Sequence, residues 1–261
     1  MREEKDPSAA IRQHHDKMLR LVAKSFYNEL INYGVNKAQV LSVAGHLLDN
    51  VMQDNSPANK TGDYYNQLFT TKDVRDEWAG ARRLTVHQVS ITPFNPSLVP
   101  QIASWLSVPD IREGFYPNFP EKEQELAAYF LVPTREYFSI WCEQELAGMI
   151  GAEHIDPFAQ KLEMRKLVGD PRMHGRGIGK RATFLFLYHV FQIRKFRKVY
   201  LHSLDINIRN LNLNAKFGFE LEGVFLEDAL VQAKRRDVIR MGLFAPVWNR
   251  LFVAGSRAFK T

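Results

Sequence analysis

The sequence predicts a mixed domain of the α/β or α+β class, preceded by an N-terminal helical appendage. Three observations support this. Residues 8–33 and 37–53 have helical patterns, short β-like and helical runs alternate from Arg83 onward, and three closely spaced glycines precede a long apolar stretch. The chain has 261 residues, of which 45% are hydrophobic and 25% are charged. This composition is typical of soluble globular proteins, and the length allows a sizeable core.

The N-terminal region reads as two helices. Apolar residues recur at steps of three, four and seven within residues 8–33, and a second helix is expected over residues 37–53. Asn36 and Gln39 have the spacing of a capping box at its start. The polar stretch "QDNSPANKTGD" that follows is typical of a linker. We therefore expect a helical region over residues 1–80, a sheet domain over 81–250 and a tail over 251–261.

The elements of the second domain follow from shorter patterns. Alternating or β-branched runs predict strands, and longer runs with helical spacing predict helices. The expected strands are 83–91, a hairpin within 135–155, 161–170, 198–204, 219–231 and 235–244. The expected helices are 96–106, 121–131, 179–195 and 209–217.

Charge and cysteine content narrow the function. Residues 161–261 hold 20 Lys and Arg against 8 Asp and Glu, which gives this part a net charge of +12. Because the whole chain has a net charge of +6, the first 160 residues carry 6 − 12 = −6. A cationic C-terminal half suits a phosphate-bearing ligand or nucleic acid.

The single cysteine, Cys142, allows no internal disulfide and favours no metal site. No apolar run has the length of a membrane span or a signal peptide, which predicts a cytoplasmic protein with no membrane partner.

The segment "HGRGIGKRA" lies between a predicted strand and a predicted helix. Gly175, Gly177 and Gly179 would let an anion approach the free N–H groups of the helix start, with Arg176 and Lys180 adding positive charge. A tight turn that only improves helix–sheet packing is the alternative. The spacing fits neither a P-loop, which requires a glycine where His174 stands, nor a dinucleotide fingerprint.

The same segment resembles the [QR]-x-x-G-x-[GA] motif of the GNAT superfamily of acetyl-CoA-dependent N-acetyltransferases. "NIRNLNLNAKFGFELEG" is similar to a helix-to-strand segment of that family, with Asn210 in its serine position and Lys216 aligned. "RRDVIRMGLF" resembles the closing strand of the branch with the ribosomal-protein N-terminal and amino-sugar nucleotide acetyltransferases. The resemblance covers residues 83–244.

The resemblance implies a central sheet that is splayed beside strand 161–169 and flanked by helices. It also implies acetyl-CoA as co-substrate and no metal. The pantetheine arm would lie against Leu167 and Val168, as a peptide pairs with a strand edge. The remaining coenzyme contacts would come from His174, Gly175, Arg176, Gly177, Ile178, Gly179, Lys180, Asn207 and Lys216.

The implied chemistry is direct attack of a primary amine on the thioester. Such a reaction needs a deprotonated amine, a polarised carbonyl and a proton for the leaving thiolate. We assign the base to Glu163, acting through water, with His154 and His174 as alternatives and an ordinary surface role for Glu163 left open. The family's usual acid is a tyrosine, but Asn214 stands in its position. The thiolate would instead be handled by Asn207, Asn210, water or a tyrosine from elsewhere in the chain.

The acceptor would be a small molecule, such as an amino-sugar nucleotide or an amino acid derivative, or a protein N-terminus. Arg112, Glu113 and Tyr116 are the candidate substrate-binding residues, in a loop rich in aromatic and charged side chains. A non-catalytic acyl-CoA-binding regulatory or interaction protein is the alternative function, because the tyrosine is missing. Nucleic acid is not favoured, since no groove-binding motif is found. The apolar stripe of the N-terminal helices predicts a homodimer or partner contact.

Overall fold

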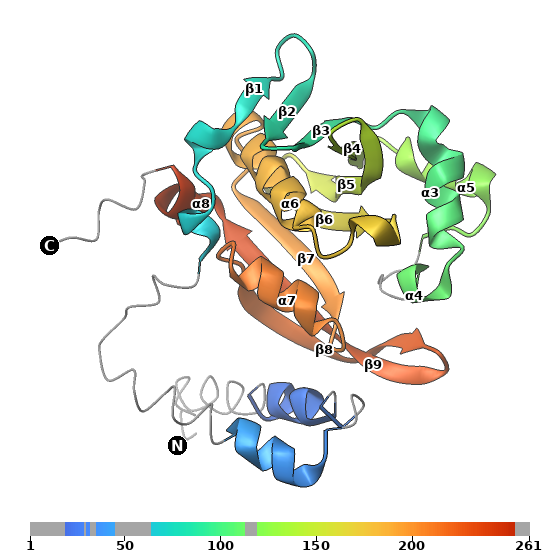
Figure 1. Ribbon diagram of the computed structural model, residues 1–261, viewed down its shortest axis with the longest axis vertical. Coiled ribbons are helices and arrows are strands. Elements are labelled where there is room, and N and C mark those ends of the chain that lie inside the picture. Colours follow the sequence, from blue (N-terminus) through green and yellow to red (C-terminus); the bar gives the residue numbers. More distant parts are fainter. Residues whose placement is uncertain (1–18, 29, 32–34, 45–63, 113–118, 254–261) are drawn as a thin grey trace, which may run out of the picture. The chain divides into compact units, whose positions relative to one another are not determined.

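Figure 1 shows the chain as a computed structural model that describes residues 19–28, 30–31, 35–44, 64–112 and 119–253. The chain divides into two compact units, Met1–Gly62 and Asp63–Thr261. Phe69 and Trp78 belong to the core of the second unit. The sheet domain therefore takes in the connector that we assigned to the helical region 1–80.

The first unit contains helical residues 19–28, 30–31 and 37–44. The predicted capping box is confirmed at the start of the second helix. The N–H of Gln39 donates to Asn36 Oδ1 and the N–H of Asn36 donates to Gln39 Oε1, both at 3.0 Å. The predicted extensions of these helices over residues 8–18 and 45–53 lie outside the described residues.

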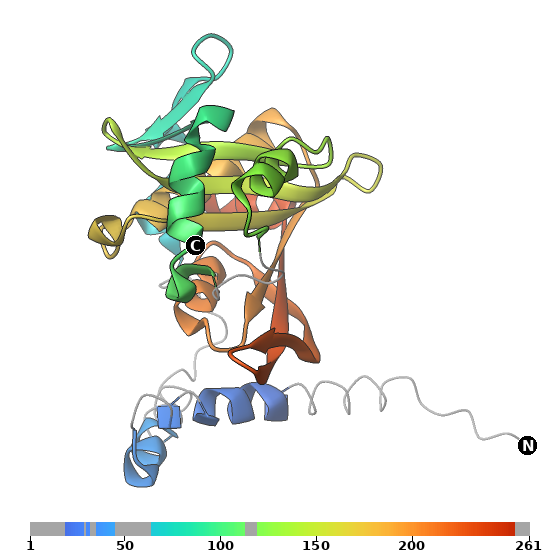
Figure 2. The ribbon, with the colours of Figure 1, turned by 90° about the vertical axis from the view of Figure 1, so that its right-hand side faces the viewer.

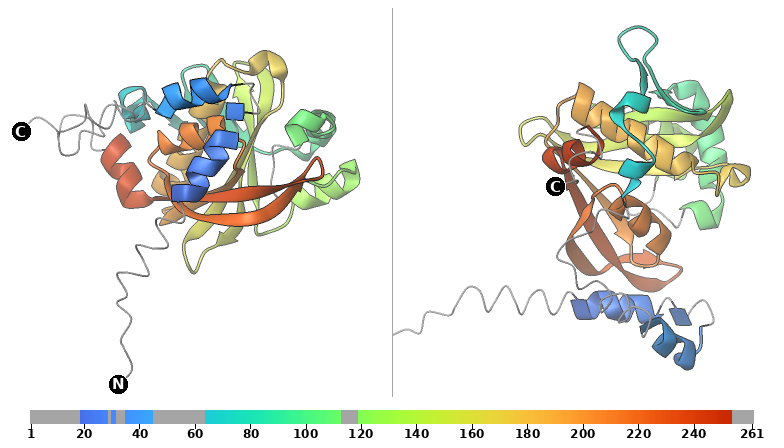
Figure 3. Two further views of the ribbon diagram at one scale, coloured as in Figure 1. Left: turned by 90° about the horizontal axis from the view of Figure 1, so that it is seen from below. Right: turned by 60° about the vertical axis from the view of Figure 1, so that its left-hand side comes forward.

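The second unit is built on a nine-stranded sheet in the order β1-β2-β3-β4-β5-β6-β7-β9-β8. Neighbouring strands are antiparallel except for β6 and β7, and the long β8–β9 hairpin forms one edge (Figures 1 and 3). The strands are β1 Arg75–Glu77, β2 Arg83–Val86, β3 Val89–Pro93, β4 Glu136–Cys142, β5 Glu145–Asp156, β6 Lys161–Val168, β7 Lys198–Leu204, β8 Glu220–Val231 and β9 Lys234–Phe244. The predicted α/β class with helices flanking a central sheet is confirmed.

Helices cover both faces of this sheet. α6 (Ile178–Tyr188) and α8 (Ala245–Phe252) pack on one face, where Phe138, Ile150 and Met164 point. α3 (Val99–Leu106) and α5 (Glu123–Phe130) pack on the opposite face (Figure 2). The side chains of the alternate positions Tyr137, Met149 and Leu167 belong to the cluster on that face. The remaining helices are the short α4 (Pro109–Arg112) and α7 (Ile208–Ala215). We call these surfaces of the sheet the α6 face and the α3 face.

The sheet is open between β6 and β7. These two strands pair only through Lys161–Lys198, Leu162–Val199 and Glu163–Tyr200. β6 continues to Val168 beside β5, but no ladder to β7 accompanies it past Glu163. The strand edge from residue 164 onward is thus exposed to the space between the two strands.

The structure differs from the predicted elements in several places, among them α4, which lies in a segment predicted as a loop. The single strand expected over residues 83–91 is two strands, because His87 takes a left-handed conformation with φ of 52° and turns the chain between β2 and β3. β1 and α8 were not predicted, since one has only three residues and the other follows a strand without a strong start signal. Within the described ranges, no helix has both the length and the apolar character required to cross a bilayer.

Candidate functional site

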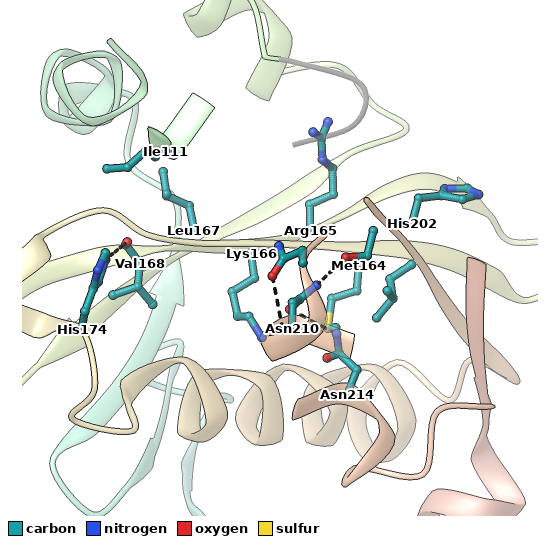
Figure 4. A pocket seen from close by; sticks show the side chains of 13 residues that line it. Ile111, Met164, Arg165, Lys166, Leu167, Val168, His174, His202, Asn210 and Asn214 are labelled. Atoms are coloured by element: carbon teal, nitrogen blue, oxygen red, sulfur yellow. Dashed lines mark hydrogen bonds between the residues drawn. The ribbon is translucent and has the colours of Figure 1, made fainter. Parts of the chain in front are cut away.

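A cavity of about 260 Å³ lies where β6 and β7 diverge. Arg165 and Leu167 reach it from the α3 face, while Met164 and Lys166 reach it from the α6 face (Figure 4). Its lining is Ile111, Met164, Arg165, Lys166, Leu167, Val168, His174, Leu201, His202, Ser203, Asn207, Asn210 and Asn214. The gap in the sheet is therefore lined by different side chains on the α3 face and on the α6 face.

The glycine turn precedes α6 as predicted. Gly175 and Gly177 have positive φ angles of 77° and 74°, and a side chain on Gly175 would meet no atom within 4 Å. Gly177 is the N-cap of α6, so the unpaired N–H groups of the first helical turn follow it directly. An open, left-handed turn at a helix start is a ready site for an anion.

Two lysines and an aromatic ring lie near this turn. Lys180 Nζ is 5.5 Å and Lys216 Nζ is 6.0 Å from the ring centroid of Tyr65. The N–H of Tyr65 also donates to the carbonyl of Lys216 at 2.9 Å. Tyr65 was missed by our sequence reasoning because it lies in a segment that had been assigned to the connector. Arg176 instead directs its guanidinium at Met173 Sδ, at 3.0 Å.

His174 and the three asparagines complete the sides of the cavity. His174 Nε2 donates to the carbonyl of Val168 at 2.8 Å, which ties the turn to the end of β6. Asn207 caps α7 by accepting from the N–H of Asn210. Asn210 donates to Ser203 and accepts from Asn214 Nδ2 at 3.2 Å. These bonds show Asn207 and Asn210 holding α7 in place, and amide side chains do not donate protons as acids.

Glu163 lies on β6 beside the cavity, with only 3% of its side chain exposed. Its Oε2 accepts from His154 Nδ1 at 2.9 Å and its Oε1 from His202 Nδ1 at 3.0 Å. Burial raises the pKa of Glu163, but the hydrogen bond and charge of His202, the hydrogen bond of His154 and the charge of Arg165 outweigh it, so the pKa lies below the ordinary 4.5. A carboxylate with both oxygens bound and a lowered pKa is a poor base. We therefore revise our assignment of the base to Glu163.

His202 was not among the residues that we selected from the sequence. It lies on β7, lines the cavity, and has its Nδ1 fixed by Glu163. Nε2 is the remaining ring nitrogen, and a carboxylate at Nδ1 sets it up to accept a proton. His154, by contrast, is 59% exposed in its side chain and does not line the cavity.

Replacing Glu163 by glutamine should flatten the acid dependence of stability. A carboxyl with a lowered folded-state pKa adds stability that is present above its unfolded value of about 4.5 and is lost as the pH falls through the folded value. Urea unfolding from neutral pH through the acid range should give a steeper loss of unfolding free energy for the wild type than for Glu163→Gln. Parallel curves for the two proteins would contradict this.

A second buried carboxylate lies directly opposite the first. Glu153 on β5 pairs with Glu163 across the ladder, on the α3 face. Its Oε1 lies 3.3 Å from Arg165 Nη1 and accepts from Tyr129 at 2.6 Å and from Tyr137. The Glu153 and Arg165 side chains are 1% and 4% exposed. Burial, with the nearby Glu153 charge adding to it, raises the pKa of Tyr137, and burial likewise raises that of Tyr129 to about 12, so both phenols stay protonated donors.

Lys166 occupies the α6 face of the cavity. Its Nζ donates to Thr183 Oγ1 at 2.8 Å, and Thr183 in turn donates to the carbonyl of Gly179 at 2.8 Å. Among the described residues, no carboxylate lies within 4.0 Å of its Nζ. Burial lowers the pKa of Lys166 to about 7. A partly buried, unpaired amine is uncommon unless it has a task, and our sequence reasoning overlooked it.

The predicted acceptor loop is described only in part. Arg112, at the end of α4, donates from Nη1 to Glu121 at 2.8 Å and is not among the residues that line the cavity. Glu113 and Tyr116 lie outside the described residues, so their predicted role stays a prediction. No group of three or more metal-ligating side chains occurs among the described residues.

The part of the chain that forms the cavity resembles a known protein family. Residues 101–219 match the model of the acetyltransferase (GNAT) family. This part of the chain belongs to the GNAT superfamily. The match lies within the wider range 83–244 that the motifs indicated. The specific branch that we named is not distinguished by it.

Two relatives of this GNAT domain are polyamine acetyltransferases by name. Spermidine N(1)-acetyltransferase of Escherichia coli (strain K12) is 26% identical over 107 residues, which are 41% of this chain and 57% of that protein. Spermine/spermidine N(1)-acetyltransferase of Bacillus subtilis (strain 168) is 32% identical over 54 residues, which are 21% of this chain and 36% of that protein. The chain thus matches little more than half the length of the first and about a third of the second.

The GNAT fold also recurs in a solved structure. Spermidine N-acetyltransferase from Vibrio cholerae, in complex with CoA and spermine, has a TM-score of 0.58 and 20% identity, and the match covers 62% of this chain and 98% of that chain. Identity this low supports a shared fold and nothing finer.

Proposed function

We propose that the chain is an N-acetyltransferase that moves an acetyl group from acetyl-CoA to a primary amine by direct attack. Membership of the GNAT superfamily supports the reaction class, and the cavity between β6 and β7 is the observation that carries the proposal. The acceptor class, a cytoplasmic location and a homodimer through the N-terminal helices stay predictions.

The residues at this cavity fit acetyl-CoA. The edge of β6 beyond Glu163 has no partner strand, the turn at Gly175 and Gly177 is open, and Asn214 Oδ1 is buried with no hydrogen-bond partner among the described residues. The strand edge around Leu167 and Val168 would hold the pantetheine arm. The glycine turn with Lys180 would hold the pyrophosphate, and Lys216 and Tyr65 would lie toward the nucleotide end.

Acetyl-CoA supplies an acyl group that is already activated as a thioester. His202 Nε2 takes the proton of the incoming amine, while Glu163 holds Nδ1 and stabilises the charged ring. The main-chain N–H groups of the β6 edge polarise the carbonyl. Because His202 reaches the cavity from the α3 face, the acceptor would enter from that side, near Arg165 and Ile111.

The acceptor is open to a direct screen. The names of the relatives make spermidine and spermine the first amines to test, yet the described lining of the cavity contains no carboxylate to bind a polycation. Amino-sugar nucleotides, amino acid derivatives and peptide N-termini therefore belong in the same panel. Thiol release with one of these amines would support the enzyme, whereas CoA binding without thiol release on any amine would favour the regulatory alternative.

Replacing Gly177 by alanine should weaken CoA binding about tenfold. A side chain at a φ of 74° costs about 1–2 kcal/mol, and relief of that strain would turn the N–H groups away from the anion. Calorimetric titration with CoA measures the effect. Gly223→Ala is the matched control, because Gly223 has no atom within 4 Å of the added carbon and no positive φ. Equal affinities for Gly177→Ala and the wild type would argue against the turn as the pyrophosphate site.

A further inference from the structure

The missing tyrosine leaves the proposed reaction without an obvious acid. The titratable side chains that line the cavity are Arg165, Lys166, His174 and His202. Arg165 keeps its proton, because the Glu153 charge outweighs burial and raises its pKa. His174 is bound to the end of β6 and His202 acts from the α3 face, on the acceptor side. Lys166 enters from the α6 face, on the side of the cavity opposite to Arg165 and His202.

The surroundings of Lys166 suit a proton donor. Thr183 gives its single hydroxyl hydrogen to Gly179, so its oxygen must accept from Lys166 and fixes the position of Nζ. The other N–H groups of the amine stay available toward the cavity. A side-chain carbon on Gly179 would lie 3.9 Å from Lys166 Cε, which places the lysine stem beside the glycine turn.

The groups that face Lys166 from neighbouring elements leave its charge uncompensated. α7 contributes the neutral amides of Asn210 and Asn214 to the same side of the cavity (Figure 4). α6 contributes the neutral hydroxyl of Thr183, which accepts from Nζ. With burial and no acidic partner among the described residues, the ammonium readily releases a proton near neutral pH.

We propose that Lys166 is the acid of the reaction, which gives a proton from Nζ to the sulfur that leaves. This inference rests on the proposed function. As the new C–N bond forms and the C–S bond breaks, the sulfur keeps the electron pair of the broken bond and takes the Lys166 proton. His202 has by then taken the proton of the amine, and both side chains are restored by exchange with water. Lys166 thus stands in for the tyrosine that Asn214 replaces.

The first test measures the pKa of the thiol of bound CoA and needs no turnover. The ultraviolet absorbance of the CoA thiolate is titrated with pH for CoA bound to the wild type, Lys166→Met and Lys161→Met. A protonated Lys166 close to the sulfur stabilises the thiolate, so the thiol pKa should be lower in the wild type and in the Lys161 control than in Lys166→Met. Lys161 lies on the same strand outside the cavity. Equal thiol titration in all three would overturn the proposal.

The second test is kinetic. Lys166→Met should lower kcat about a hundredfold, with the KM for acetyl-CoA and the CoA affinity changed only a few-fold. The wild type should lose kcat as the pH rises above about 7, and this alkaline limb should be absent from the variant. Lys166→Arg keeps a charge but cannot donate a proton, so it should not restore the rate.

The outcomes separate the two proposals. Unchanged kcat in Lys166→Met, or a loss of CoA affinity as large as the loss of kcat, would overturn the role of Lys166 and leave the acetyltransferase in place. Failure of the wild type to bind CoA would remove both. Thermal unfolding of each variant checks folding, and Lys166→Met should be at least as stable as the wild type because it removes an unpaired buried amine.

Discussion

Replacing His202 by glutamine should lower kcat/KM for the amine acceptor about a hundredfold to ten-thousandfold. Glutamine can still donate to Glu163, but it has no basic nitrogen to take the proton of the amine. Steady-state kinetics with the best acceptor from the screen measure the effect.

The histidine on the other side of Glu163 is the matched control. His154→Gln removes an equivalent hydrogen bond to the same carboxylate, but its ring lies away from the cavity. This variant should keep kcat/KM within a few-fold of the wild type. Glu163→Gln should add little to His202→Gln, because the two side chains act as one unit. Equal losses in the His154 and His202 variants would show that Glu163 only needs its partners for folding.

Replacing Arg165 by methionine should lower the free energy of unfolding by about 3–5 kcal/mol. The substitution leaves the Glu153 carboxylate buried at 1% exposure with two tyrosines but no countercharge, and removes the guanidinium 4.2 Å from the Phe119 ring. Urea denaturation measures the loss. The double variant Glu153→Leu with Arg165→Met should recover most of it, because it removes both members of the buried pair and leaves neither charge without its partner.

A surface ion pair provides the comparison. Arg112 bonds to Glu121 at 2.8 Å with side chains 32% and 74% exposed, so Arg112→Met should cost less than about 1 kcal/mol. A loss for Arg165→Met as small as for Arg112→Met would mean that water reaches Glu153 and that the cluster is not a buried one.

Much of the fold could be predicted from patterns of residues that are close in the sequence. The capping box at Asn36 and Gln39 and the turn at Gly175 and Gly177 depend on residues a few positions apart, and the structure has both. The order of strands and α-helices from α5 to β9 follows periodicity in the same way. The turn at His87 was missed because a histidine in a left-handed conformation leaves no distinct signal in the sequence.

The chemistry of the cavity depends on pairings between strands, which the sequence does not state. Glu163 and Glu153 become neighbours only through the β5–β6 register, and His202 reaches Glu163 only because β7 lies parallel to β6. One signal was nevertheless available. The segment "KLEMRKLV" is almost fully buried yet holds charged residues at both of its alternating faces, and such charges rarely lie inside a sheet without partners or a task.

The three-residue seam between β6 and β7 has a consequence for how this domain could change over time. A ligand that completes the sheet through main-chain bonds is recognised regardless of which side chains the strand displays. Under the proposed function, the side chains of that strand would therefore be free to take up other tasks, such as the proton transfer that we propose for Lys166. Substitutions along the strand could in this way change the acceptor amine, while the main-chain bonds proposed to hold the coenzyme stay the same.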